Sequence, residues 1–479
     1  MTGRSDGAPT DPESNREADR SRAEPAPPTD LGALVDACVT ADATGLVAVG
    51  DRFDDDLRYL TRFTGPDREF ALVVVPDGAI DADIGGADGR QSRGRAVLCA
   101  PTLFGAQARR EFVERAREES GAFHDGVVRE VRLEHADEPV GRRAVAAIED
   151  LVGEPERGAS DDERSGSSTD RTVVVPRSIP HDAAVYLERA GYTATSTTAI
   201  SEARRVKTDA ELHRLRRVQH AATVAMARAE TVLADGDVRS TPDGDVRSTP
   251  DDDVRSTPDD DDATNADAPV LVHADAPLTT ERLRRVIDAT LAGLGMRDAG
   301  NTVVGAGASA ADLHYRGIDP IRPDETVLVD ISPRGPHGYY GDLTRTFVVD
   351  GDGGWARRAY VAVEAARKAA LAEIEPGATA GGVHREAAAE LAAYGFDPNA
   401  SEGAAGFTHG IGHGVGVSLH EAPSLTSDAA LCAGHVVTVE PGVYDPNRGG
   451  VRLEDLVAVT EEGYELLATY PFGTTPTSE

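Results

Sequence analysis

The chain has 479 residues, of which 40 % are hydrophobic and 28 % are charged, and its formal net charge at pH 7 is -34. This length exceeds one ordinary hydrophobic core and predicts two domains with polar tails. Such an acidic surface repels phosphates, which excludes nucleic acid as a partner, and no apolar run approaches the roughly 18 residues of a membrane helix.

Residues 1–30 contain no apolar stretch of the kind found in secretory signals, so we expect a disordered acidic tail and a cytoplasmic protein. The three cysteines are far apart and predict no disulfide framework, as expected in a reducing compartment. The acidic residues are spread along the whole chain, and only two basic residues are lysine. Molar salt shortens the Debye length to about 3 Å and relieves such repulsion. The composition therefore indicates a salt-rich cytoplasm, with binding of a basic partner as the weaker alternative.

Residues 31–200 alternate apolar runs with helical patterns and predict a smaller N-terminal α/β domain. Continuous apolar runs between helices are typical of strands in a largely buried sheet. A polar stretch at 153–170 predicts a surface insertion. The expected elements are strands at Thr44–Gly50, Phe70–Pro76, Ala96–Ala100 and Thr172–Pro176, and a helix at Ala106–Ser120.

The C-terminal domain is expected over residues 201–479 and begins with a helical pattern at Thr208–Ala234. Thr208 is a predicted N-cap with Glu211 at the capping-box position. Three units of eight residues follow, DGDVRSTP twice and DDDVRSTP once. Each offers one valine for burial, so we expect a disordered insertion over 235–268. A calcium-binding repeat is the alternative, but the glycine turn and closing acid of an EF-hand are missing.

Two aspartates lie in the segment Thr326–Asp350, which predicts a β-hairpin turning near 333–338. Asp330 ends an apolar strand and Asp342 lies on the returning strand. An unpaired aspartate in an apolar strand costs several kcal/mol, and two facing acids repel each other. The pattern favours a cation between them, with two unrelated strand-end acids as the alternative. Further helices are expected at Thr280–Leu294, Gly354–Ile374 and Thr379–Tyr394.

Three histidines, His409, His413 and His420, lie in the glycine-rich segment FTHGIGHGVGVSLHEAP. A spacing of four residues would suit a helix, but each interior glycine costs a helix about 1 kcal/mol. We therefore expect extended backbone that brings imidazoles close to a ligand. Strict alternation would place His413 and His420 on opposite faces, whereas a bulge at the glycines would bring both to one cleft. Histidines with a purely structural role are the alternative.

Two glutamates lie in strand patterns near the C-terminus. Glu440 ends an apolar strand before a Pro-Gly turn, and Glu454 is expected inside a strand with Arg452 two residues back on the same face. Four carboxylates and one imidazole suit two divalent first-row ions about 3.5–4 Å apart. Mn²⁺ is the expected ion, with Co²⁺ and Zn²⁺ as alternatives. The expected ligands are Asp330, Asp342, His413, Glu440 and Glu454.

The motifs DLTRTF, HGIGHGVG, HEAP, EPGVY and VRLED, in this order, resemble those of the pita-bread metallopeptidases of the prolidase and aminopeptidase P branch. The resemblance spans about residues 201–465, and DLRYLTRFTG at 56–65 is weakly similar to the family's N-terminal domain. It implies an α+β fold: a C-terminal pita-bread domain, which is a curved antiparallel sheet flanked by helices, after a smaller α/β domain. It also implies a homodimer that hydrolyses Xaa-Pro bonds in peptides with two metal ions, as a dipeptidase or an aminopeptidase.

The resemblance assigns roles to individual residues. The four acids and one histidine named above would bind metal, and Glu440 would also accept a proton from the attacking water. His314 or His420 would stabilise the oxyanion. His409 and Arg452 would contact substrate, and Glu454 would hold Arg452 in place.

The sequence departs from the family pattern at two points. The interval between the two aspartates is one residue longer, and Ser332 stands where glycine is common. The alternatives in function are another metalloaminopeptidase of this fold, a metal-independent hydrolase similar to creatinase, and a non-enzymatic pita-bread binding protein.

Overall fold

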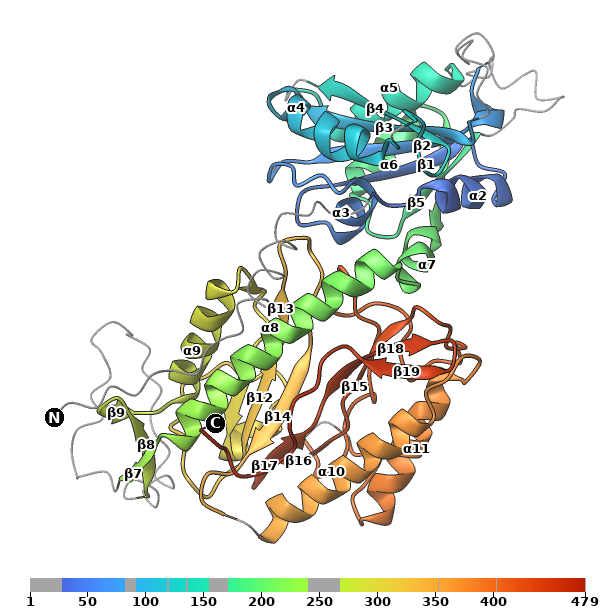
Figure 1. Ribbon diagram of the computed structural model, residues 1–479. Coiled ribbons are helices and arrows are strands. Elements are labelled where there is room, and N and C mark those ends of the chain that lie inside the picture. Colours follow the sequence, from blue (N-terminus) through green and yellow to red (C-terminus); the bar gives the residue numbers. More distant parts are fainter. Residues whose placement is uncertain are drawn as a thin grey trace. The chain divides into compact units, whose positions relative to one another are not determined.

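The computed structural model describes residues 28–478 except 82–91, 119, 135–136, 155–170, 240–267, 352 and 402 (Figure 1). Most of the expected tail and of the expected insertion therefore lies outside the described residues. The chain divides into two compact units, Met1–Arg204 and Arg205–Glu479. Among the helices of the described ranges, none combines the length and apolarity that crossing a membrane requires.

The N-terminal unit contains a mixed six-stranded sheet in the order β4-β3-β2-β1-β5-β6. Its central strand β2 is buried along its whole length, which explains its continuous apolar sequence. β4 and β6 alternate irregularly between buried and exposed residues, and for this reason the sequence pattern missed them. The strands are β1 (Gly45–Gly50), β2 (Phe70–Pro76), β3 (Gly94–Pro101), β4 (Val127–Glu134), β5 (Arg171–Pro176) and β6 (Tyr192–Thr197).

Helices of the N-terminal unit cover this sheet, and α5 supplies much of the apolar surface. The helix expected at Ala106–Ser120 is shorter and irregular, because α4 (Gly105–Ala108) continues as a π turn and a 3₁₀ turn that end at Ala116. The others are α2 (Gly32–Thr40), α3 (Asp55–Thr61), α5 (Val140–Val152), α6 (His181–Arg189) and α7 (Ala199–Arg205), with 3₁₀ turns at Asp77–Ala79 and Thr102–Phe104.

Helix α8 (Asp209–Ala234) begins at the predicted capping box. The Thr208 hydroxyl accepts from the Glu211 main-chain N–H at 3.4 Å, and the Glu211 carboxylate accepts from the Thr208 N–H at 3.0 Å. The same carboxylate accepts from the Tyr339 hydroxyl at 2.7 Å. The cap therefore fixes both the start of α8 and its contact with the loop that carries Tyr339.

Replacing Thr208 with Ala should lower the free energy of unfolding by about 1 kcal/mol, because the first turn loses its side-chain acceptor. Thr231, whose hydroxyl donates to the Ala227 carbonyl within the same helix, supplies the control: its alanine variant should be neutral or slightly more stable. Thermal unfolding at fixed salt compares the two. Equal losses would show that the cap contributes nothing specific.

All strand pairings in the described part of the C-terminal unit are antiparallel. The sheets have the orders β11-β12-β14, β15-β18-β19, β16-β17, β10-β13 and β7-β8-β9. The strands are β7 (Asp237–Arg239), β8 (Val270–His273), β9 (Ala276–Pro277), β10 (Arg297–Asp298), β11 (Val303–Ala306), β12 (Val327–Ile331), β13 (Pro333–Arg334), β14 (Leu343–Phe347), β15 (Val436–Val439), β16 (Gly442–Asp445), β17 (Gly449–Arg452), β18 (Asp455–Thr460) and β19 (Gly463–Leu466).

The expected disordered insertion begins too early in the sequence. Residues 237–239 form β7, which pairs with β8 so that Val238 lies opposite Leu271. β8 is apolar and largely buried, and its main chain needs a hydrogen-bonding partner on this side. The repeat therefore contributes its first residues to a small sheet.

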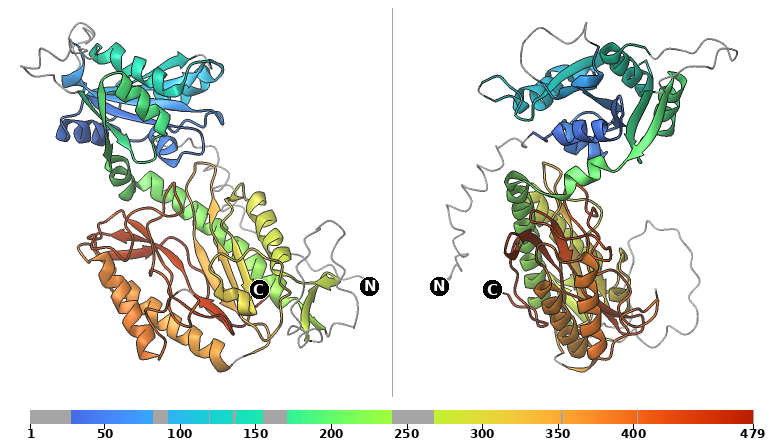
Figure 2. Two further views of the ribbon diagram at one scale, coloured as in Figure 1. Left: turned by 180° about the vertical axis from the view of Figure 1, so that it is seen from behind. Right: turned by 90° about the vertical axis from the view of Figure 1, so that its right-hand side faces the viewer.

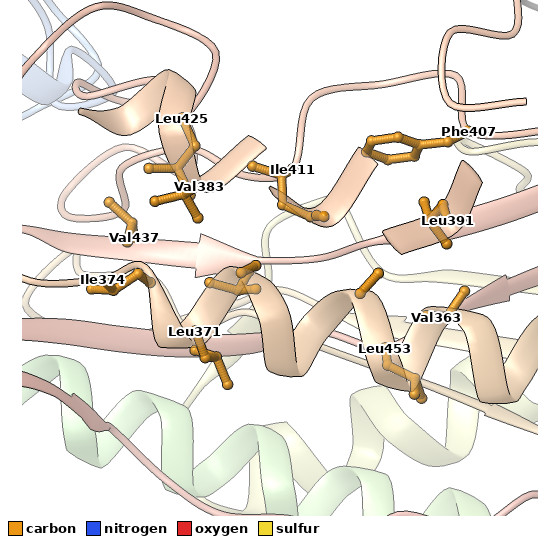
Figure 3. Packing of buried hydrophobic residues seen from close by; sticks show 14 of the residues in the cluster. Val363, Leu371, Ile374, Val383, Leu391, Phe407, Ile411, Leu425, Val437 and Leu453 are labelled. Atoms are coloured by element: carbon orange, nitrogen blue, oxygen red, sulfur yellow. The ribbon is translucent and has the colours of Figure 1, made fainter. Parts of the chain in front are cut away.

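Two hydrophobic cores cover the strands of the C-terminal unit. α8 and α9 (Thr280–Gly293) pack on β11, β12 and β14, whereas α10 (Gly354–Ala372) and α11 (Ala380–Ala393) pack on β15 and β18. Figure 3 shows part of the second core, where Val363, Leu371, Val383 and Leu391 gather with Val437. Figure 2 shows these helices and strands from two further sides. Because the helices cover one face, the other is free to carry polar residues.

Candidate metal centre and substrate cleft

Three carboxylates from separate segments meet on the polar side of these strands. Asp330 lies in β12, Asp342 directly precedes β14, and Glu454 lies between β17 and β18. One oxygen from each lies within 4.8 Å of the others. The expectation that Glu454 lies inside a strand is wrong: β17 ends at Arg452 and β18 begins at Asp455, so Glu454 occupies the short link between them.

Hydroxyl and amide groups hold these carboxylates in place. The Ser332 hydroxyl donates to Asp342 at 2.9 Å, and the Thr344 hydroxyl donates to Glu454 at 2.6 Å. The Gln219 carboxamide on α8 accepts from the Asp342 N–H at 2.7 Å and donates to its carbonyl at 2.6 Å. The longer hairpin therefore still brings both aspartates to one place, and Ser332 serves as a donor there.

His413 and Glu440 complete the cluster. His413 Nε2 lies 3.4 Å from Glu440 Oε1 and 3.9 Å from Asp342 Oδ2. Its Nδ1 lies 3.1 Å from the Gly414 carbonyl, so Nδ1 carries the proton, and the lone pair of Nε2 faces the carboxylate cluster, where a cation could accept it. A Cβ at Gly412 would lie 2.1 Å from the Thr438 carbonyl. Glycine there lets the loop approach β15 closely.

The charges of the cluster do not balance by themselves. Burial raises the pKa of Asp342, and the Asp330 and Glu440 carboxylates raise it further. Burial likewise raises the pKa of Glu454 and of Glu440, whereas burial lowers the pKa of His413 and keeps its imidazole neutral. Four crowded carboxylates, of which Asp342 and Glu454 are buried, carry more negative charge than Arg452 and a neutral imidazole offset. They therefore require protons or cations, and the oxygen and nitrogen donors of the cluster fit divalent metal ions.

A cleft of about 420 Å³ opens beside this cluster. The His413 and His420 rings lie 4.1 Å apart, because the glycine-rich loop turns back at the bridge between Gly414 and Glu421. Burial, followed by the effect of His413, lowers the pKa of His420 to about 4. The cleft is lined by every residue proposed from the sequence, namely His314, Asp330, Asp342, His409, His413, His420, Glu440, Arg452 and Glu454.

Arg452 is not held by Glu454, as the sequence analysis expected, but by three other residues. Its Nη2 donates to Asp330 at 2.6 Å, its Nη1 to the Tyr444 hydroxyl at 3.1 Å and its Nε to the Thr344 hydroxyl at 3.2 Å. Glu454 is bound by Thr344 instead of holding the guanidinium, because it lies on the link beyond the strand. His409 Nε2 also reaches the Tyr444 hydroxyl, at 2.8 Å.

Four residues of the site were not predicted from the sequence. Tyr444 and Thr344 lie within quoted motifs, and their strand positions beside Arg452 and Asp330 were the available signal. Gln219 is a buried amide on the apolar face of α8. Lys207, one of only two lysines, forms a buried ion pair with Glu421 at 2.5 Å and so secures the segment that follows His420.

Curated relatives match about a third of the chain. The probable dipeptidase PepE of Mycobacterium tuberculosis is 37 % identical over 164 residues, which are 34 % of this chain and 42 % of the relative. The Xaa-Pro dipeptidase of Pyrococcus furiosus is 34 % identical over 174 residues, 36 % of this chain and 48 % of the relative. The aligned segments thus span less than half the length of these relatives.

Solved structures match nearly the whole chain. Dipeptidase PepE from Mycobacterium ulcerans aligns with a TM-score of 0.66 at 23 % identity, over 93 % of this chain and 96 % of that one. The prolidase from Pyrococcus horikoshii OT3 aligns with a TM-score of 0.66 at 17 % identity, over 93 % and 99 %. These likenesses confirm the expected pita-bread fold. The model of metallopeptidase family M24 matches residues 213–461, more than half of the chain, and the chain therefore belongs to that family.

Proposed function

We propose that this chain hydrolyses Xaa-Pro peptide bonds with two divalent ions, Mn²⁺ first among the candidates. The observation that carries the proposal is the cluster of four carboxylates and one imidazole at the base of a cleft that His409 and Arg452 also line. The expected ligands are Asp330, Asp342, His413, Glu440 and Glu454. Relatives named Xaa-Pro dipeptidase support the choice of substrate.

Bound metal would supply an activated water and a Lewis acid at the scissile carbonyl. Glu440 would accept the proton of that water, and its position 3.4 Å from His413 in the cluster supports this role. His420 has its pKa lowered by burial and is neutral near pH 7, so its ring offers one N–H to the developing oxyanion. His314, which also lines the cleft, is the other candidate for that role.

The bond before proline poses a recognition problem, because a prolyl amide has no N–H. The cleft must bind the ring and the carbonyl instead. Leu313 and Leu419 offer apolar surface in the lining. Arg452 already donates to three partners, but each of its terminal nitrogens carries a second N–H, which we assign to the substrate's carbonyl or carboxylate. His409 adjoins it through Tyr444.

A peptide panel assayed with Mn²⁺ at molar salt tests the proposed function. Ala-Pro and Met-Pro should be cleaved, and Met-Ala should be a poor substrate because it lacks the ring. Cleavage of Arg-Pro-Pro would assign an aminopeptidase, and its absence a dipeptidase. If Met-Ala is cleaved as readily as Ala-Pro, a general aminopeptidase replaces the proposal.

We further propose that the protein works in a salt-rich cytoplasm as a homodimer. Between 0.1 and 3 M KCl the Debye length falls from about 10 Å to under about 3 Å, which relieves repulsion within a chain of formal charge -34. The midpoint of thermal unfolding should therefore rise steeply over this range. Sucrose, which does not screen charge, is the control. A midpoint indifferent to KCl would contradict the interpretation, and light scattering in 3 M KCl would measure the oligomeric state.

A further inference from the structure

Arg345 is the third residue of β14 and one of the largest fully buried side chains, with 1 % of its surface exposed. A guanidinium carries five N–H donors, and all five of Arg345 are used. Their acceptors are the carbonyls of Thr344 (2.9 Å), Glu454 (2.7 Å), Tyr470 (3.0 Å) and Pro471 (3.3 Å) and a carboxylate oxygen of Asp455 (2.9 Å).

These acceptors belong to two groups. Thr344, Glu454 and Asp455 form the framework of the candidate metal centre, whereas Tyr470 and Pro471 begin the segment 470–478, here named the C-terminal strap. The second oxygen of Asp455 pairs with Arg367. The Phe472 ring lies 4.4 Å from both guanidinium carbons, that of Arg345 and that of Arg367. The strap thus contacts both arginines that bind Asp455, the residue next to Glu454.

The strap is anchored at its far end too. Glu230 on α8 accepts from the Tyr470 hydroxyl, and from the N–H and hydroxyl of Thr477 at 2.9 and 3.1 Å. The Val348 N–H donates to the Thr474 carbonyl at 2.7 Å. The strap lies beyond residues 213–461, which match the family model.

Within the described ranges, three hydrogen bonds orient Glu454. It lies in the link between β17 and β18, outside the strand ladders. Its N–H donates to the Thr344 carbonyl at 3.1 Å, its carbonyl accepts from Arg345, and its carboxylate accepts from the Thr344 hydroxyl. If Arg345 moves, the hydrogen bond from Arg345 to the Glu454 carbonyl is lost, and two hydrogen bonds remain to orient the Glu454 carboxylate.

We propose that the C-terminal strap is a positioning element of the metal centre: it fixes Arg345, and Arg345 fixes Glu454. The inference rests on the metal-binding role proposed for Glu454. It predicts that metal affinity depends on the aromatic side chain of Phe472, which follows the last proposed ligand, Glu454, in the sequence.

Mn²⁺ binding to the metal-free full-length protein, measured by calorimetry at molar salt, tests this. Phe472→Leu keeps an apolar side chain but loses the ring over two guanidiniums, so its dissociation constant for Mn²⁺ should rise about 5-fold. Phe472→Tyr keeps the ring and should bind as the wild type does. Phe53, a half-exposed ring beside Arg52 in the N-terminal unit, provides the matched control, and Phe53→Leu should leave affinity unchanged.

Arg345→Lys tests the second link, since an ammonium cannot serve five acceptors. Its Mn²⁺ dissociation constant should rise at least about 10-fold. The double variant with Phe472→Leu should lose less than the product of the single losses, because both act on one guanidinium. Should Phe472→Leu not fold, Tyr470→Phe, which loses only the hydroxyl bound to Glu230, replaces it in the comparison.

The outcomes separate the two proposals. If the wild type does not bind Mn²⁺, the metal centre itself is wrong. The strap plays no positioning role if folded Phe472→Leu binds Mn²⁺ as well as the wild type does. The same holds if the loss of Mn²⁺ affinity in the double variant equals the product of the two single losses.

Discussion

Asp342→Asn should lose hydrolysis of Ala-Pro by at least about 100-fold and retain less metal than the wild type. Loss of even an indirect supporting partner of a metal ligand costs 10–100-fold, and Asp342 is one of three carboxylates with oxygens within 4.8 Å of one another. The amide keeps the shape of the side chain. Its main-chain bonds to Gln219 do not involve the carboxylate, so the fold should persist.

The same variant should also be more stable than the wild type when both are free of metal. Asp342 is buried among like charges, so without metal its carboxylate destabilises the fold. Metal-free Asp342→Asn should therefore unfold at a higher temperature than metal-free wild type, whereas the order reverses with metal present. Asp350→Asn, which removes an exposed carboxylate nearby, is the control and should change neither quantity. Full activity of Asp342→Asn in the presence of a chelator would refute the assignment.

Arg452→Lys should lower kcat/KM for Ala-Pro by about 10- to 100-fold while sparing metal content. The substitution keeps the positive charge but loses the planar fork, and each lost hydrogen bond to a charged group costs about 1.5–3 kcal/mol. The side chain is buried with 4 % of its surface exposed, so water cannot replace the missing donors.

The matched control is Arg448→Lys, at an exposed arginine in the turn between β16 and β17, which should behave as the wild type. Metal content decides between two roles of Arg452. Because its Nη2 contacts Asp330 at 2.6 Å, a variant that loses metal would make Arg452 a support of that ligand and remove it from the proposed substrate contacts.

Sequence patterns predicted the elements whose burial is regular. Helix α8 has a cap and a helical repeat of apolar residues, and β2 is a continuous apolar run, so each gives a clear sequence signal. β4 and β6 are half-buried without regular alternation, and no pattern marks them. The start of the insertion was misplaced for a related reason: β7 is fully exposed, and only its pairing with β8 makes it a strand.

The acids and histidines of the site were predictable because each is costly where it lies. An aspartate in an apolar strand, or histidines among glycines, demands a partner. Their supports were not predictable, since those contacts join distant segments. Thr344 and Glu454 are 110 residues apart, and Arg452 and Asp330 are 122 apart. Which hydroxyl or guanidinium reaches which carboxylate depends on how the separate sheets of the C-terminal unit pack against one another.

The most direct measurement adds Mn²⁺ back to the metal-free protein at molar salt and records bound metal and Ala-Pro hydrolysis together. The protein in chelator should be inactive, and activity should return as ions bind, reaching its maximum at two per chain. Hydrolysis that persists in chelator, or that is complete without bound metal, would contradict a metal-dependent Xaa-Pro peptidase.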